Sequence, residues 1–554
     1  MMDTPTERCD VLILGGGLAG LTLALQLKQR FPALAIEVIE RRRHPVPEAA
    51  FKVGESTVEI GAHYFAEVLG LKDHLDQQQI RKFGFRFFFS DRRRDIDAVT
   101  EIGVRRPLAV PSWQIDRGIF ENFLATEVQA RGMRFHDGAR VTRLALDEHG
   151  TAPHRVHWQQ GDSGHITERT TEARWLVDAS GRVGLVKRQL GLAQDNAHPC
   201  HAVWFRVAHR IPVDDWGGAD WRAQCTPPER WRSTNHLVGT GYWVWLIPLS
   251  SGSHSVGIVA DPRHHPLERM DSFDKAMDWL REHQPRLFDE LDPRRETLQD
   301  FAFFRKFSYG CRQVFSGRRW ALTGEAGLFL DPFYSPGSDF IGIANTLITE
   351  LVALDQAGQP LGAHASLYDQ LFHSFYDNTL SLYQDQYALF GQPEVLPVKV
   401  IWDYSYYWGL LGQLFVQHRI ADLKLLSSLR DELALCQRLN RAVQALLRAW
   451  GEAAVDDPNP PRMLDQSSLP WFAALNASLN DARLDDDALR QRLRDNTQLL
   501  RELAAEIADR VAALQPQVDV APLRSLIGPL PDGVPVRLFP LAAAAMPPAM
   551  ANTA

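Results

Sequence analysis

The chain has 554 residues, of which 45% are hydrophobic and 23% charged, and its formal net charge is −8. This length exceeds what one hydrophobic core usually serves, so we expect two or three structural units. The negative charge argues against general binding of nucleic acid. The five cysteines are scattered and form no CxxC pair, so we predict neither a disulfide framework nor a metal site.

The composition of the two ends predicts no membrane association. The first residues are polar and lead directly into a short apolar run, without the basic and apolar regions of a signal peptide. The longest late apolar stretch, 541–546, is too short to span a bilayer. We therefore expect a cytoplasmic protein without a membrane span.

The first predicted elements are a strand, a turn and a helix. Residues 9–14 form a short apolar run, residues 21–30 have helical spacing, and a second apolar run at 34–39 ends at Glu40. Together these segments have the length of a β-α-β unit. The arginine runs at 41–43 and 92–94 are predicted to be solvated, although 41–43 could also hold a 2′-phosphate.

Glycines follow the first strand, where a dinucleotide-binding turn requires them. Gly15, Gly17 and Gly20 occupy positions at which a side chain would block the approach of a diphosphate to the N–H groups that begin a helix. Glu40 stands about twenty positions later, where an acidic residue accepts hydrogen bonds from ribose hydroxyls. We predict that this turn, including Leu18 and Ala19, binds a nucleotide; an incidental glycine turn is the alternative.

The pattern changes twice in the second half of the chain. Alternating apolar stretches between about 200 and 310 predict an antiparallel sheet. From about 338 the spacing becomes helical, and two helices are predicted near 426–450 and 489–514. An aromatic-rich run at 372–408 could line a pocket or serve helix packing.

Three segments indicate which nucleotide is bound. They read WQIDRGIF at 113–120, VDASGR at 177–182 and LTGEAG at 322–327. These segments resemble the two-dinucleotide-binding flavoproteins of the aromatic hydroxylase type, which usually have Asp at the position of Glu325. The resemblance implies that the nucleotide is FAD, with cofactor contacts from Gln114, Arg117, Asp178, Gly181, Gly324 and Glu325.

Four further matches narrow the resemblance. They are FKVGES at 51–56, WVWLIP at 243–248, FLDPFYSPG at 329–337, and Lys82 within RKFGFRF at 81–87. They resemble the flavin-dependent halogenases, particularly the branch that acts on phenols, pyrroles and carrier-bound aromatics. The resemblance implies cofactor contacts from Lys52, Gly54, Glu55, Ser56, Pro332 and Gly337, catalytic roles for Lys82 and Ser335, and a substrate pocket that includes Trp243, Trp245, Phe333 and Tyr334.

The implied reaction explains why these residues would be needed. A separate flavin reductase supplies reduced FAD, which with dioxygen oxidises a halide ion to hypohalous acid. A lysine then captures or hydrogen-bonds this oxidant and directs halogen to an electron-rich aromatic or carrier-protein-bound substrate in natural-product biosynthesis. A buried amine suits this role, because an apolar setting lowers its pKa.

Three of these residues have plainer interpretations. Lys82 could be a surface residue ahead of a strand. Trp243 and Trp245 lie two apart, so in a strand they face the same side and could form only a core stripe.

The predicted halide site is where the sequence departs most from this family. A halide would use backbone N–H groups around Ser335 to Gly337, ahead of a helix, but Pro336 has no N–H and Asp339 adds a negative charge. The alternative is therefore a flavin monooxygenase, or an acyl desaturase or reductase, that does not bind halide. A non-catalytic member of a biosynthetic complex is a third hypothesis.

Together these observations predict an α/β fold. We expect a Rossmann-type FAD-binding domain of the aromatic hydroxylase type, an antiparallel β-sheet substrate domain and a C-terminal α-helical cap. The predicted boundaries are 1–195 and 311–360 for the FAD-binding domain, 196–310 for the sheet domain, 361–537 for the helical region and 538–554 for a flexible tail. The substrate, the choice between chloride and bromide, and the oligomeric state are left open.

Overall fold

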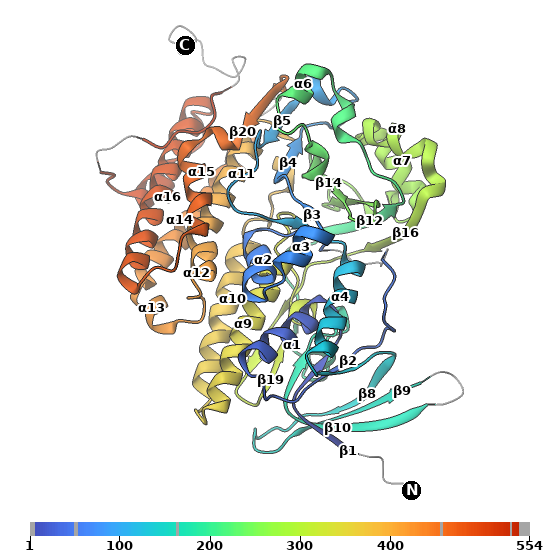
Figure 1. The fold of residues 1–554 in the computed structure, drawn as a ribbon. Helices are drawn as coiled ribbons and strands as arrows, with labels where there is room; N and C mark the ends of the chain where they lie inside the picture. Colours follow the sequence, from blue (N-terminus) through green and yellow to red (C-terminus); the bar gives the residue numbers. More distant parts are fainter. Residues whose placement is uncertain (1–5, 49–53, 162–165, 455–457, 532–534, 542–554) are drawn as a thin grey trace. The chain divides into compact units, whose positions relative to one another are not determined.

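The computed structural model describes residues 6–48, 54–161, 166–454, 458–531 and 535–541. The chain forms two compact units. Figure 1 colours the chain by residue number, from blue at the N-terminus to red at the C-terminus. Unit 1 comprises Met1–Gln79, Ile115–Ala197 and Ser308–Asp377, and unit 2 comprises Ile80–Gln114, His198–Phe307 and Asn378–Ala554. The C-terminal helices therefore share a unit with the central strands, and the predicted domain boundaries remain a prediction.

Unit 1 is built on a mainly parallel sheet. Its strand order is β18-β19-β10-β1-β2-β7, with parallel pairing from β19 to β7. Strands β8 and β9 extend from β10 as an antiparallel ribbon, which Figure 1 shows clearly. The bounds are β1 (Thr6–Leu14), β2 (Ile36–Ile39), β7 (Arg134–His136), β8 (Ala139–Ala145), β9 (His154–Gln160), β10 (Thr167–Asp178), β18 (Phe315–Ser316) and β19 (Trp320–Leu322). The predicted Rossmann-type arrangement is confirmed.

The helices of unit 1 are α1 (Leu18–Arg30), α2 (Glu59–His63), α3 (Lys72–Gln78), α4 (Arg117–Ala130), α5 (Leu185–Gln189) and α9 (Gly337–Gln356), and α10 (Gly362–Leu380) follows. Two of these helices, α4 and α9, pack against α1. Asn345 of α9 donates to the Ala19 carbonyl oxygen at 3.2 Å and accepts from the Thr323 hydroxyl at 2.7 Å. This buried amide joins α9 to the start of α1 and to the end of β19.

Helix α9 has a long and apolar sequence. It is the one described helix that is long and apolar enough to cross a membrane, and 67% of its most apolar window is buried inside the protein. Its contacts with α1 and α2 are those of a core helix of a globular domain.

Unit 2 is built on a mixed sheet. Its order is β16-β12-β15-β14-β13-β4-β5-β20, and its pairs are antiparallel except β13 with β4 and β5 with β20. The bounds are β4 (Phe85–Phe88), β5 (Thr100–Gly103), β12 (His201–Val207), β13 (Thr234–Gly239), β14 (Tyr242–Pro248), β15 (His254–Ala260), β16 (Leu298–Phe304) and β20 (Arg462–Asp465). The antiparallel prediction is confirmed for β12 to β16, and the parallel additions come from distant segments.

One face of this sheet is covered by α7 (Phe273–His283) and α8 (Pro285–Leu291), which contribute Trp279 and Leu287 to a hydrophobic core with the strands. The C-terminal part of unit 2 contains more helices than the two predicted. They are α11 (Val395–Tyr406), the π-helix η10 (Tyr407–Gly412), α12 (Gln413–Val416), α13 (Leu423–Ser428), α14 (Arg430–Ala453), α15 (Pro470–Ala477), α16 (Asp486–Leu514) and α17 (Ala521–Ile527). The helix predicted near 426–450 is broken at Leu429, because α13 ends at Ser428 and α14 begins at Arg430.

A buried lysine fastens two of these helices. The Nζ atom of Lys399 on α11 donates at 2.8 Å to Asp403, to the Gln444 side chain on α14 and to the Leu382 carbonyl oxygen. Beyond α17, Leu538 and Phe539 are buried, and Arg510 donates to the Phe539 carbonyl oxygen at 2.5 Å. Ordered packing thus extends to the first residues of the predicted tail, and 542–554 lie outside the described residues.

A buried carboxylate organises the edge of the unit 2 sheet. Glu101 on β5 contacts the guanidinium of Arg86, accepts from Arg230 Nε at 3.0 Å and accepts from Trp221 Nε1 at 2.8 Å. All four side chains are buried. The carboxylate therefore joins β4, β5 and the turn that precedes β13, and it neutralises charge that could not otherwise stay in the interior.

We predict that Glu101→Gln lowers the free energy of unfolding by about 3–5 kcal/mol, because two buried guanidinium groups lose their anion. Urea denaturation of the full chain measures this change. The control is Glu452→Gln, which alters an exposed residue without an ion pair among the described residues and should be close to neutral. Equal stability of the two variants would contradict the prediction.

Candidate active site

The glycine turn predicted to bind a nucleotide lies between β1 and α1. Gly15 has a φ of +119°, and a Cβ there would lie 2.3 Å from the Ala179 carbonyl oxygen. A Cβ at Gly20 would lie 2.0 Å from the Gly15 carbonyl oxygen. At Gly17, by contrast, a Cβ would meet only Glu121 Oε1, at 3.9 Å. Gly15 and Gly20 therefore permit close packing, whereas Gly17 leaves the N-terminus of α1 open, as a diphosphate requires. Leu18 and Ala19 are buried as the first residues of α1.

Glu40 follows β2 and reaches this turn. Its carboxylate accepts from the Gly16 N–H and from the Arg42 N–H, both at 2.6 Å. A Cβ at Gly16 would lie 2.8 Å from Glu40 Cβ, so Gly16 is a site residue that the spacing of three glycines did not predict. Arg41 to Arg43 are exposed, as the solvated alternative predicts.

A second predicted segment meets the turn through Arg117. The Ile115 N–H donates to the Glu55 carbonyl oxygen at 2.6 Å, and Arg117 donates to the Gly54 carbonyl oxygen at 3.4 Å and to Glu121 at 2.6 Å. Glu121 is buried beside Gly17. The structure thus brings the loop Gly54 to Ser56 and the start of α4 to the cradle, with Glu121 as an unpredicted member. Lys52 lies outside the described residues.

Two predicted cofactor residues have side chains that are occupied inside the protein. Gln114 belongs to unit 2, where its amide donates to Thr234 Oγ1 at 3.0 Å and to the Arg232 carbonyl oxygen at 3.3 Å. Asp178 accepts from the Ser180 hydroxyl at 2.6 Å and from the Val186 N–H at 2.7 Å, and burial raises the pKa of its carboxyl group. Asp178 thus holds the turn that follows β10. Gly181, in that turn, has a φ of +63° and open space around it.

The late motif reaches the same place from β19. A Cβ at Gly324 would lie 2.9 Å from the Ala19 Cβ, so this turn packs on the first residues of α1. The carboxylate of Glu325 pairs with Arg182 Nε at 3.1 Å, and the Arg182 guanidinium lies 5.1 Å from the ring centres of both Tyr309 and Phe329. The longer side chain of Glu325 thus reaches an arginine that the motif comparison did not single out.

The turn predicted to bind halide precedes α9. Tyr334 and Ser335 have φ values of 66° and 53°, and the Ser335 N–H donates to the Pro332 carbonyl oxygen at 2.9 Å. Such conformations are strained in residues other than glycine and cluster at functional sites. Phe333 is buried, and its ring centre lies 4.4 Å from that of Tyr334.

The first turn of α9 contains both the N–H groups that could bind a halide and the carboxylate of Asp339. The N–H groups of Gly337 and Ser338 precede the first i to i−4 bond of the helix, which the Phe340 N–H makes to the Pro336 carbonyl oxygen at 3.1 Å. Asp339 is buried and accepts from the Gly61 N–H of α2 at 2.7 Å. The Asp339 carboxylate thus has a donor of its own in α2. A Cβ at Gly337 would meet no described atom within 4 Å, so space is open there.

Lys82 lies in unit 2, between β3 (Ile80–Arg81) and β4. Its side chain is 5% exposed, and Nζ lies 3.3 Å from the ring centre of Phe85. The backbone N–H of Lys82 donates to the Ser112 carbonyl oxygen at 2.9 Å. The surface interpretation of Lys82 is therefore wrong, because its side chain is buried with the amine against the face of an aromatic ring.

Aromatic side chains continue from Phe85 across the sheet. Its ring centre lies 5.3 Å from that of His236 and 6.1 Å from that of Tyr404, and His236 lies 5.4 Å from Trp243. Trp243 and Trp245 face the same side of β14, as predicted, with ring centres 5.7 Å apart. We call this group the aromatic cluster; it contains Phe85, His236, Trp243, Trp245, Tyr404, Trp408 and Phe472.

The indole N–H groups of Trp243 and Trp245 both have hydrogen-bond acceptors within unit 2. Trp243 Nε1 donates to the Tyr387 hydroxyl, and Trp245 Nε1 donates to the Ser255 hydroxyl, both at 3.1 Å. His236 donates from Nδ1 to the Arg86 carbonyl oxygen at 3.1 Å. Burial, with the nearby charge of Lys82, lowers the pKa of His236 to about 3, so this ring is neutral at working pH.

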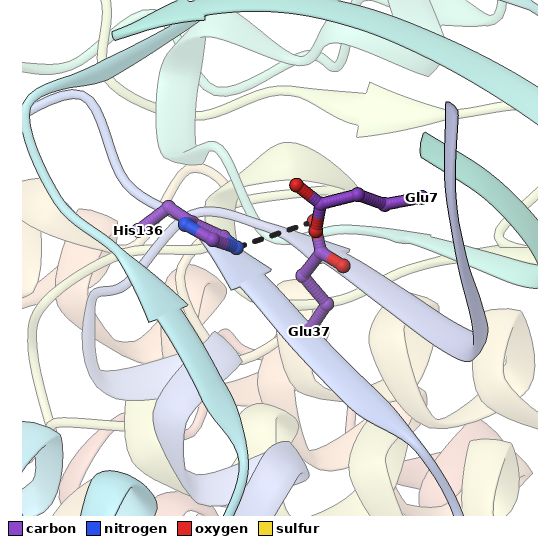
Figure 2. Close-up of side chains that lie close together, drawn as sticks. All are labelled: Glu7, Glu37 and His136. Atoms are coloured by element: carbon purple, nitrogen blue, oxygen red, sulfur yellow. Dashed lines mark ion pairs between the residues drawn. The ribbon is translucent and has the colours of Figure 1, made fainter. Parts of the chain in front are cut away.

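One group outside these regions has the composition of a metal site. Glu7, Glu37 and His136 offer ligand atoms within 4.8 Å of one another, as Figure 2 shows. However, Arg134 donates to Glu37 at 2.6 Å and Arg169 donates to Glu7 at 2.7 Å. Each carboxylate already has a cation, so this group does not attract a metal ion by its charge.

We predict that Gly20→Ala abolishes FAD binding, because the new Cβ would collide with the backbone of Gly15 and displace the cradle. Flavin fluorescence titration of the purified chain measures the affinity. The control is Gly362→Ala, in the same unit, where a Cβ would meet no described atom within 4 Å. Unchanged affinity in Gly20→Ala would show that the turn does not hold the cofactor.

We also predict that His236 makes the protein less stable in acid. The pKa of a histidine in the unfolded chain is near 6.5, so below this pH the unfolded state binds a proton that His236 takes up only near pH 3. The loss should reach about 2 kcal/mol at pH 5.

Urea denaturation of wild type and His236→Asn at pH 7.5 and pH 5 tests this sign. The variant lacks the titrating group, so the stability difference between the two proteins should shift by that amount in favour of the variant at pH 5. A difference that does not change with pH would contradict the prediction.

Comparison with known proteins agrees with this arrangement. The family model described as FAD binding domain matches residues 8–285. Flavin-dependent halogenase chlA of Dictyostelium discoideum is 27% identical over 433 residues, covering 74% of this chain and 70% of the relative. A 1H-pyrrole-2-carbonyl-[peptidyl-carrier protein] chlorinase of Pseudomonas fluorescens is 25% identical over 362 residues, covering 59% and 72%.

A solved structure shares the fold. Halogenase PltM in complex with phloroglucinol and FAD matches with a TM-score of 0.61 and 17% identity, covering 90% of this chain and 96% of that one. The predicted aromatic hydroxylase-like fold is confirmed. Because the family model spans half of the chain, this protein belongs to the FAD binding domain family, and it is an FAD-dependent oxidoreductase related to the flavin-dependent halogenases.

Proposed function

We propose that this protein is a flavin-dependent halogenase that installs a halogen on an electron-rich aromatic substrate. The observation that carries the proposal is the setting of Lys82, whose amine is buried against the face of Phe85 at one end of the aromatic cluster. A lysine in this place can receive an oxidised halogen and meet an aromatic ring in the absence of water.

The residues around the glycine turn fit FAD. The open N-terminus of α1 at Gly17 suits the diphosphate, and Glu40 beside Gly16 suits the ribose hydroxyls. Arg117 and Glu325 lie on segments that reach the same turn and are proposed to contact the remainder of the cofactor. When bound in reduced form, FAD would supply the two electrons that reduce dioxygen to the oxidation level of peroxide, at which it oxidises a halide to hypohalous acid.

The start of α9 is the proposed halide site. Pro336 removes one donor, but the N–H groups of Gly337 and Ser338 stand at a helix N-terminus, where an anion is favoured. The charge of Asp339 is engaged by the Gly61 N–H of α2. The two features that argued against halide therefore leave donors available, and Ser335 contributes through the strained turn that positions them.

Lys82 is the proposed catalytic group. Its amine either hydrogen-bonds hypohalous acid or forms an N–halogen bond with loss of water, and it then delivers the halogen to a ring carbon that loses a proton. His236, whose ring lies beside that of Phe85, is neutral at working pH. Trp243 and Trp245 are proposed to form an apolar wall of the substrate pocket, and Phe333 and Tyr334 of unit 1 remain proposed contributors.

The substrate and partner classes follow from the relatives. One related chlorinase acts on a carrier-bound pyrrole, and one related halogenase was solved with phloroglucinol. We infer an electron-rich aromatic substrate, free or carrier-bound, a separate flavin reductase as the source of reduced FAD, and a cytoplasmic location. The relatives do not favour the monooxygenase, desaturase or reductase alternatives.

We predict that the wild-type chain, with a flavin reductase, FAD and bromide, adds a mass with the bromine isotope pattern to phenols or pyrroles. Lys82→Ala should lower this rate about 100-fold or more while FAD binding persists. Lys82→Arg should be equally inactive, because a guanidinium keeps the charge without a nucleophilic amine.

Mass spectrometry of the products measures bromination, and Lys424→Ala is the control, since it removes an exposed lysine of unit 2. Bromination by Lys82→Ala at the wild-type rate would remove Lys82 from the mechanism. Oxygen insertion without bromine would overturn the proposed function.

A further inference from the structure

Trp408 is a buried tryptophan in the π-helix η10, between α11 and α12. Its side chain is 1% exposed, yet its indole Nε1 has no hydrogen-bond partner among the described residues. A buried indole N–H usually finds an acceptor, and leaving it unpaired is costly. An unpaired donor inside the protein therefore requires an explanation.

A second buried tryptophan in the same helical run, Trp402, does have an acceptor for its indole N–H. Trp402 lies on α11, shortly before η10, and its Nε1 donates to Asn440 Oδ1 of α14 at 2.9 Å. Trp204 and Trp216 of the same unit also lack a described acceptor. Trp408 differs from these two by its place, because it belongs to the aromatic cluster.

Ring contacts connect Trp408 to Lys82 without a break. The Trp408 ring centre lies 4.8 Å from Tyr404 and 4.6 Å from Phe472. The Tyr404 ring centre lies 6.1 Å from Phe85, whose face covers Lys82 Nζ at 3.3 Å. The indole therefore belongs to a cluster of tilted rings, and the amine lies against one ring of that cluster, within one unit.

The backbone around Trp408 is itself unusual. A π-helix is rare, has poorer hydrogen-bond geometry than an α-helix and occurs frequently at functional sites. Here Asn496 of α16 donates to the Gly409 carbonyl oxygen at 2.8 Å, so a buried side chain supports the irregular turn. The fold maintains η10 where regular helix would otherwise continue from α11 to α12.

We propose that Trp408 is a substrate-binding residue whose indole N–H donates to an oxygen atom on the aromatic substrate and thereby orients the ring toward Lys82. This inference rests on the proposed halogenase function. The substrate class is an electron-rich arene or pyrrole that carries a hydroxyl or carbonyl oxygen. Both oxygens accept from an indole N–H, and the aromatic rings that contact Trp408 give such a substrate an apolar setting.

The first test asks whether the N–H is unpaired in the free protein. Trp408→Phe and Trp402→Phe remove the same atoms from buried positions in one helical run, but only Trp402 loses a hydrogen bond. We expect Trp402→Phe to lower Tm more than Trp408→Phe. An equal or larger loss in Trp408→Phe would mean that the N–H is already satisfied, for example by the Phe472 ring, and would overturn the proposal.

The second test measures discrimination between substrates. We expect Trp408→Phe to lower kcat/KM for bromination of resorcinol or pyrrole-2-carboxamide about 10-fold or more, and to leave pyrrole, which carries no oxygen, within about 2-fold. The probe that loses most identifies the oxygen as hydroxyl or carbonyl. Trp402→Phe should not alter these ratios, and an equal loss for all three probes in Trp408→Phe would overturn the proposal.

A third measurement separates this inference from the proposed function. If wild type brominates none of the probes, the proposed function fails, and the indole 15N–1H resonance that is missing in Trp408→Phe then tests the inference alone. A shift of this resonance when resorcinol or pyrrole-2-carboxamide is added to the FAD-loaded chain supports it. A resonance that stays constant with both probes overturns it.

Discussion

The nucleotide cradle of unit 1 depends on a backbone contact that leaves no room for side chains. The backbones of Gly15 and Gly20 approach so closely that a Cβ at Gly20 would lie 2.0 Å from the Gly15 carbonyl oxygen. A Cβ at Gly15 would likewise lie only 2.3 Å from the Ala179 carbonyl oxygen. This contact brings the end of β1, the residue after β10 and the start of α1 to one point. Gly324 then packs on Ala19, so three parts of the chain that are distant in the sequence meet at the helix N-terminus, where an anion is favoured.

Elements with a local signal could be predicted from the sequence, and elements held by distant contacts could not. The β-α-β unit and Glu40 follow from apolar runs and spacing, and Trp243 and Trp245 share a face because side chains alternate along a strand. In contrast, β20 joins the sheet of unit 2 beside β5, far away in the chain, and no local pattern specifies that pairing. The sequence also did not predict the break at Leu429. Leu426 before the break, Leu429 itself and Cys436 after it are all buried, so the apolar spacing continues across it. An unbroken helical spacing does not reveal such a break.

The same distinction applies to the candidate site. Glu121 approaches the turn only because α4 packs against α1, and Gln114 points into the sheet because Thr234 lies opposite it. Glu325, which departs from the family pattern, and Asp339, which adds a negative charge near Pro336, both have partners from distant parts of the chain. Glu325 reaches Arg182, and Asp339 accepts from Gly61. A carboxylate that is paired in this way repels an incoming anion less than its formal charge suggests, and motif comparison cannot see the partner.

In the proposed substrate site, selectivity depends on which polar atoms face the aromatic cluster rather than on the apolar area of that cluster. An apolar pocket distinguishes poorly between molecules that differ by a methylene group or an added hydroxyl, whereas a donor that must be satisfied rejects molecules without an acceptor. The donors of Trp243 and Trp245 are satisfied by Tyr387 and Ser255, so β14 contributes shape and exclusion of water. The recognition that we propose for the substrate therefore depends on residues that the helices contribute, above all on Trp408 in the π-helix η10.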